Sequence, residues 1–91
     1  MKKILVVCGN GLGSSFIVEM NVKVILKELG IEAEVSHTDL TTSKTERADY
    51  YLGAADLVEN LEDGNRNVIK LDNIMDKQEL RVALETNLKE V

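Results

Sequence analysis

The chain has 91 residues, a formal net charge of -5 and no cluster of Lys and Arg along its sequence. This balance argues against nucleic acid or an anionic membrane as the main partner, and the length predicts one domain over residues 1–91. Hydrophobic residues make up 44% and aromatic residues 3%, which indicates a core of Val, Ile and Leu. A single cysteine forms no intramolecular disulfide, so we expect a reducing, cytoplasmic location.

The first half of the chain predicts a strand, a helix and a second strand. Residues 4–8 are short and apolar throughout, as in a strand buried on both faces, and their apolar run is too short for a signal peptide. Ser14 or Ser15 can cap a helix that runs to about Leu29 and ends at Gly30. We expect this helix to bury its apolar residues against the sheet and to leave a polar stripe in water. The apolar set is Ile17, Val18, Met20, Val22, Val24, Ile25 and Leu29, and the stripe is Glu19, Lys23 and Lys27.

The second half predicts two more strands and two more helices after a half-exposed strand at residues 32–37. The expected elements are a crossover at 41–47, a strand at 50–52, a short helix at 56–61, a turn at Gly64 and Asn65, a strand at 68–71 and a last helix that begins at Asp76. Asp76 and Glu79 have the spacing of a capping box, and Leu80, Leu84 and Leu88 have helical spacing.

This alternation of strand and helix predicts an α/β fold, a small three-layer Rossmann-like domain with a four-stranded parallel sheet flanked by helices. Because the second strand reads as an edge strand, the expected strand order is 2-1-3-4. Ligands in such sheets bind beyond the carboxyl ends of the strands, beside the first strand. Cys8 is expected there.

The residues after Cys8 predict a cradle for an anion. We expect backbone N–H groups of this loop to favour a thiolate and to surround a phosphate on the sulfur, with the serine hydroxyls as further donors. Cys8 is the candidate nucleophile, and the candidate phosphate-binding residues are Gly9, Asn10, Gly11, Leu12, Gly13, Ser14 and Ser15. The alternative interpretations are a buried structural cysteine for Cys8 and a partner-docking residue for Leu12.

Three familiar phosphate loops differ from this one. A P-loop needs Lys after its last glycine, but Ser14 follows Gly13. A dinucleotide-binding loop has different glycine spacing, since this chain has glycines at 9, 11 and 13. The cysteine phosphatase loop places Arg at the sixth position after its cysteine, and Ser14 stands there. Without that cation, attack of water on a phosphocysteine should be slow, which favours passing the phosphoryl group to another acceptor.

The segment from Cys8 to Ser15 resembles the loop of the cytoplasmic IIB components of the bacterial sugar phosphotransferase system (PTS), in its ascorbate type. The resemblance implies a phosphotransferase of one EIIB-type phosphocysteine domain. Phosphohistidine of a IIA protein would phosphorylate Cys8, which would pass the group to a sugar, ascorbate by the loop type, carried by a membrane IIC transporter. Neither a cofactor nor a metal ion is expected. The alternatives are a small cysteine phosphatase or arsenate reductase, and an anion-binding or nucleotide-binding module.

Other polar residues near this edge have no role assigned by the sequence. His37 could contact phosphate, but a partly exposed position at a strand end is the simpler interpretation. Asp39, Asp56 and Asp72 each follow a predicted strand, where capping and turn formation explain them. One Cys and one His far apart in sequence make a metal site improbable.

Overall fold

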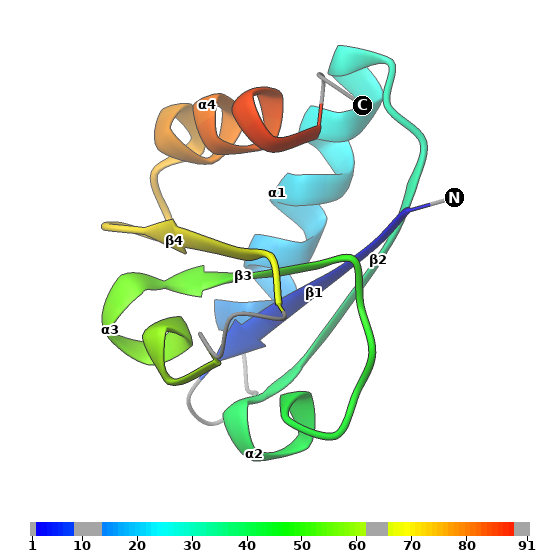
Figure 1. Cartoon of the computed structure of the whole chain (residues 1–91). Coiled ribbons are helices and arrows are strands. Elements are labelled where there is room, and N and C mark those ends of the chain that lie inside the picture. The colour runs from blue at the N-terminus through cyan, green and yellow to red at the C-terminus, as the bar shows by residue number, and fades with distance from the viewer. Residues whose placement is uncertain (1, 9–13, 62–65, 89–91) are drawn as a thin grey trace.

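The computed structural model describes residues 2–8, 14–61 and 66–88. The turn expected at Gly64 and Asn65 and most of the predicted cradle, residues 9–13, lie outside the described residues. Strands and helices alternate along the described chain as β1 (Lys2–Cys8), α1 (Ser14–Leu29), β2 (Ala33–Asp39), α2 (Leu40–Ser43), β3 (Tyr50–Ala54), α3 (Ala55–Val58), the 3-10 turn η1 (Glu59–Leu61), β4 (Val68–Leu71) and α4 (Lys77–Leu88) (Figure 1).

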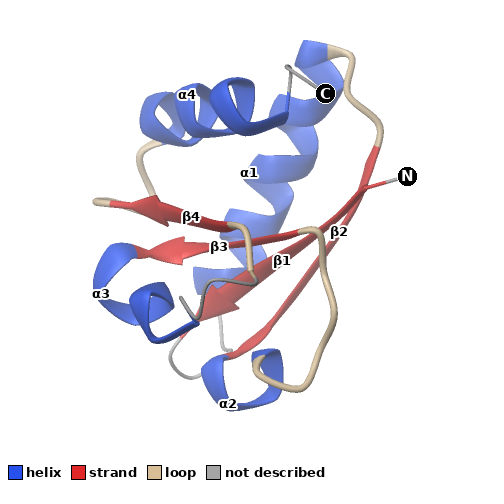
Figure 2. Ribbon diagram, viewed as in Figure 1, coloured by secondary structure: helices blue, strands red, loops and turns tan. Residues whose placement is uncertain are grey.

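The described strands form one parallel sheet in the order β2-β1-β3-β4, as predicted. Figure 2 shows α1 and α4 on one side of this sheet and α2 and α3 on the other. The larger core lies under α1 and α4 and contains Ile4, Val6 and Leu52, whereas the smaller core lies under α3 and contains Leu5 and Val7. Successive residues of β1 therefore serve opposite cores, which explains its unbroken apolar run.

Helix α1 ends as the sequence predicts. Gly30 has φ of 74°, and the N–H of Ile31 donates to the carbonyl oxygen of Leu26 at 2.9 Å. This is the hydrogen bond of a Schellman ending, in which glycine adopts the left-handed conformation at little cost.

The predicted faces of α1 are partly wrong. Val18, Val22, Ile25 and Leu26 are buried, but the expected core residues Ile17, Met20 and Val24 are about half exposed. Glu19, expected in water, is only 8% exposed. The apolar residues surround most of the helix, so periodicity alone could not select which of them face the sheet.

The start of α4 confirms one half of the predicted capping box and corrects the other. Asp76 Oδ1 accepts hydrogen bonds from the N–H groups of Gln78 and Glu79 at 3.0 and 3.2 Å. The Glu79 carboxylate, however, accepts from the N–H groups of Asp72 and Asn73 at 2.6 and 2.9 Å. Glu79 thus binds the segment after β4 to the first turn of α4. Leu80, Leu84 and Leu88 are buried as expected.

Strand β3 extends two residues beyond the predicted 50–52 and includes Gly53. A Cβ atom on Gly53 would lie 2.6 Å from the carbonyl oxygen of Val7 and 2.8 Å from Cγ1 of Val58. Only glycine therefore allows β3 to lie between β1 and α3 at this point. No described helix combines the length and the apolar character that crossing a bilayer requires.

Candidate functional site

Cys8 is the last residue of β1, an inner strand of the sheet. Helices α2 and α3 begin directly after β2 and β3, at the same edge at which β1 ends (Figure 1). Ser14 and Ser15 are the first two residues of α1, so the chain passes from Cys8 to a helix N-terminus within a few residues. Backbone N–H groups in the first turn of a helix have no intrahelical acceptor and favour negative charge nearby. The candidate nucleophile is thus placed at the expected edge of the sheet, while residues 9–13 lie outside the described residues.

Asp39 pairs with Cys8 in the backbone register of β1 and β2. Its Oδ1 accepts a hydrogen bond from the N–H of Thr42 at 3.2 Å, which caps α2 as the sequence predicts. Hydrogen bonds from the side chain and the backbone of Thr42 hold the pKa of Asp39 below its ordinary value, despite some desolvation. The cap of α2 thus accounts for Asp39, as the sequence predicts.

His37 lies two residues before Asp39 on β2, and its side chain is 33% exposed, which confirms partial exposure. The sequence did not predict its partner. His37 Nδ1 lies 2.5 Å from Glu19 Oε1, and the ring meets Phe16 edge to face at 6.2 Å between centroids. Phe16 and Glu19 are three residues apart on α1, so they share a face of the helix. His37 therefore joins β2 to the first half of α1.

Glu19 is a buried carboxylate held by two nitrogen atoms. Lys23 Nζ donates to Glu19 Oε2 at 3.0 Å, and His37 Nδ1 contacts the other oxygen. Burial raises the pKa of Glu19, but hydrogen bonds from His37 and Lys23 outweigh it and leave the pKa below the ordinary value of 4.5. Glu19 is thus ionised at neutral pH, and its charge depends on these two partners.

The remaining candidates take structural positions. Asp56 is exposed in the first turn of α3, and Asp72 is exposed after β4 with its N–H bound to Glu79. Tyr50 and Tyr51 are buried in the two cores. Among the described residues, no group of three His, Cys, Asp or Glu side chains is arranged to hold a metal ion.

An apolar stripe on α1 is exposed to solvent near the carboxyl edge of the sheet, where β1 ends at Cys8. We call this end of the sheet the Cys8 edge. Phe16, Ile17, Met20 and Val24 are each between 46% and 56% exposed. They follow the predicted cradle directly in sequence and occupy the first eleven residues of the helix. Exposed apolar residues gathered on one element are typical of a protein–protein contact surface.

Comparison with known proteins identifies the family of this chain. Residues 3–86 match the family described as "PTS system, Lactose/Cellobiose specific IIB subunit". The chain belongs to this family of IIB subunits of the sugar phosphotransferase system. Such components act as phosphotransferases in sugar uptake and work with IIA and IIC partners.

One curated relative is similar over nearly its whole length. The Ascorbate-specific PTS system EIIB component of Mycoplasma pneumoniae is 30% identical over 84 residues, which cover 89% of this chain and 88% of the relative. The resemblance expected from the Cys8 loop is thus confirmed at the level of the family.

Proposed function

We propose that residues 1–91 form a phosphoryl carrier domain of the PTS that holds the phosphoryl group on Cys8. The donor is the phosphohistidine of a IIA component, and the acceptor is a sugar carried by a membrane IIC component. Ascorbate is the proposed sugar, because the Cys8 loop resembles the ascorbate type and a relative bears that name. The place of action is the cytoplasm, where a thiol remains reduced.

The observation that carries this proposal is the position of Cys8 as the last residue of an inner strand, with α1 beginning six residues later at Ser14. The helix N-terminus favours the thiolate before transfer and the phosphate charge after it. Gly9, Asn10, Gly11, Leu12 and Gly13 are proposed to supply backbone donors, and Ser14 and Ser15 to supply donors at the helix start.

The proposed reaction has two substitution steps at phosphorus. In the first, the Cys8 thiolate forms an S–P bond while the N–P bond of phosphohistidine breaks, and the histidine nitrogen takes the released electron pair. In the second, a sugar hydroxyl forms an O–P bond while the S–P bond breaks, and the hydroxyl proton passes to a base. The thiolate is regenerated, so the carrier turns over without a cofactor.

Slow hydrolysis is a requirement for a carrier, and two features of this chain support it. Ser14 occupies the position at which cysteine phosphatases have their phosphate-binding arginine. Asp39, the register neighbour of Cys8, is engaged as the cap of α2. Both features favour transfer to a positioned acceptor over transfer to water.

Direct transfer between two proteins also needs a surface at which the partner can dock. The exposed stripe of Phe16, Ile17, Met20 and Val24 lies near the carboxyl edge of the sheet, where β1 ends at Cys8, and offers apolar contact area. We assign it to contact with the IIA phosphoryl donor, whose histidine must come within bonding distance of the Cys8 sulfur. Leu12 would extend this contact if it faces the partner.

The test is phosphoryl transfer from phosphoenolpyruvate through the general phosphotransfer proteins and a cognate IIA, followed by mass spectrometry of the intact chain. The wild type should gain one phosphoryl group, and Cys8→Ser should gain none. Turnover of an aryl phosphate by the wild type would instead support the phosphatase alternative. Equal phosphorylation of Cys8→Ser would refute the carrier mechanism proposed here.

A further inference from the structure

A pocket on the other face of the sheet from α1 gathers basic side chains that are far apart in the sequence. Its volume is about 680 Å³, and its basic lining residues are Lys3, Lys44, Arg47 and Arg66. Lys3 comes from β1, Lys44 and Arg47 from the segment between α2 and β3, and Arg66 from just before β4. We call this the basic pocket.

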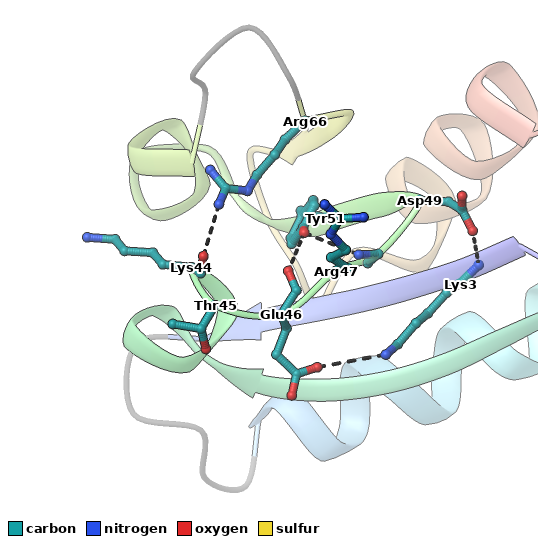
Figure 3. A pocket seen from close by; sticks show the side chains of 9 residues that line it. Lys3, Lys44, Thr45, Glu46, Arg47, Asp49, Tyr51 and Arg66 are labelled. Carbon is teal, nitrogen blue, oxygen red and sulfur yellow. Dashed lines mark hydrogen bonds and ion pairs between the residues drawn. The ribbon is translucent and has the colours of Figure 1, made fainter.

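Basic residues outnumber acidic ones among the described residues that line the basic pocket, in a chain whose net charge is -5. Its lining contains four basic and two acidic side chains. Both acidic residues interact with Lys3: Glu46 Oε2 lies 3.8 Å from Lys3 Nζ, and Asp49 Oδ2 accepts from the Lys3 N–H at 2.7 Å. Figure 3 shows this acidic group on one side of Tyr51, with Lys44 and Arg66 on the other side. Lys44 and Arg66 therefore lie apart from both acidic residues of this lining.

Tyr51 forms a rigid floor for the basic pocket. It is only 3% exposed, and its hydroxyl donates to the carbonyl oxygen of Glu46 at 2.5 Å and accepts from the N–H of Ala48 at 3.2 Å. Arg66 packs over the ring with its guanidinium carbon 5.6 Å from the centroid, and it donates to the carbonyl oxygen of Lys44 at 3.0 Å. These contacts hold the backbone of the segment that bears Lys44 and Arg47 in place.

Lys44 and Arg47 have no structural task that accounts for their charge. Both are exposed, and neither forms an ion pair or side-chain hydrogen bond with any residue that the structure describes. Lys44 extends outward at the rim of the basic pocket (Figure 3). Ammonium and guanidinium groups are the cations that bind phosphate and carboxylate groups in proteins.

We propose that the basic pocket binds a small organic anion with at least two negative charges, of the phosphomonoester or polycarboxylate class. Its volume fits a small metabolite. Lys3 lies five residues before Cys8, about 16 Å away along an extended strand. The site is thus separate from the Cys8 edge at its Lys3 end, and it does not depend on the proposed phosphoryl transfer.

The test is a titration of the ¹⁵N-labelled chain, followed by amide shifts, with inorganic phosphate, glucose 6-phosphate and citrate as separate probes. Saturable shifts at Ala48, Asp49 and Tyr51, with tighter binding of glucose 6-phosphate or citrate than of inorganic phosphate, are expected. Shifts that arise only near Ser14 and Ser15 would place the anion at the Cys8 edge and overturn the proposal. So would shifts that do not saturate.

The variant Lys44→Gln/Arg47→Gln should weaken binding about tenfold, since it removes two charge-assisted contacts while Tyr51 and Arg66 keep the floor. Lys27→Gln/Lys77→Gln is the matched control. It makes the same change in net charge at exposed lysines outside the basic pocket. Equal weakening in both double variants would show a general effect of charge and refute the site. Binding of a Glu-rich peptide but of none of the three probes would also refute it.

Discussion

His37 Nδ1 on β2 and Glu19 Oε1 on α1 lie 2.5 Å apart, and this contact joins the first half of α1 to the strand beside Cys8. His37 pairs with Val6 in the register of β1 and β2, two residues before the pair of Cys8 and Asp39. The helix that begins after the predicted cradle is therefore held to the sheet by a charged contact next to the proposed site.

Glu19→Gln should lower the free energy of unfolding at pH 7 by about 1.5–3 kcal/mol, because hydrogen bonds to a charged group are lost in a buried place. The pKa of Glu19 is lower in the folded chain than its ordinary value of 4.5. Its contribution to stability is therefore present above pH 4.5 and is lost as the pH falls through the folded pKa. Urea unfolding of both proteins from pH 7 to pH 3 measures this.

The matched control is Glu28→Gln, which removes a charge from the exposed pair of Glu28 and Arg81 on α1 and α4. Exposed ion pairs contribute little, so this variant should lose less than about 1 kcal/mol. The account of Glu19 fails if the two variants lose the same stability, or if the loss in Glu19→Gln does not shrink towards pH 3.

Gly53→Ala should destabilise the fold by about 1–3 kcal/mol through overpacking. The new Cβ would approach the carbonyl oxygen of Val7 at 2.6 Å, and this backbone atom moves only if β1 moves with it, one residue before Cys8. Thermal unfolding measures the loss. Gly30→Ala is the comparison, since nothing lies within 4 Å there and only its φ of 74° opposes alanine, at a cost of about 1–2 kcal/mol. A stable Gly53→Ala chain with unshifted amide signals at Val7 would contradict this packing.

Ile17→Ser/Met20→Ser should slow phosphoryl uptake from IIA without loss of stability. Both side chains are about half exposed, so their replacement leaves the core intact but removes apolar contact area from the proposed docking surface. A loss of about tenfold in kcat/KM for the IIA donor is expected, as for residues at the centre of an interface. Steady-state transfer at varied IIA concentration gives the value.

Val82→Ser on α4 is the control for this pair, because Val82 is 57% exposed and lies on another helix. It should transfer at the wild-type rate. If Ile17→Ser/Met20→Ser also transfers at the wild-type rate, the stripe on α1 is not the IIA contact.

The sequence predicted the sheet order because local signals at each element agreed with the global fold. The apolar run of β1, the half-polar β2 and the glycine after α1 each specify one placement. The orientation of α1 could not be predicted from the sequence. Apolar residues surround the helix, and Glu19 is buried beside a partner, His37, that lies on β2. The sequence signal that could have indicated this contact is Glu19 between the apolar residues Val18 and Met20, together with the single histidine of the chain, His37.

The position of Cys8 at the carboxyl edge of the sheet was predictable for the same reason. A strand that leads through a glycine-rich segment into a helix is expected to be the first strand of such a sheet, with the ligand site beyond its carboxyl end. The basic pocket was not predictable. Lys3, Arg47 and Arg66 are separated by long stretches of chain, and only the return of the segment before β3 across β1 brings them together. The basic residues therefore form no cluster along the sequence, although the fold brings them together.

The central claim is that one sulfur atom carries the phosphoryl group, and the direct measurement is to map the modified residue in the phosphorylated chain by fragmentation mass spectrometry under conditions that preserve S–P and N–P bonds. The account predicts a single phosphoryl group on Cys8. A phosphoryl group on His37, or on Ser14 or Ser15, with Cys8 unmodified would contradict it.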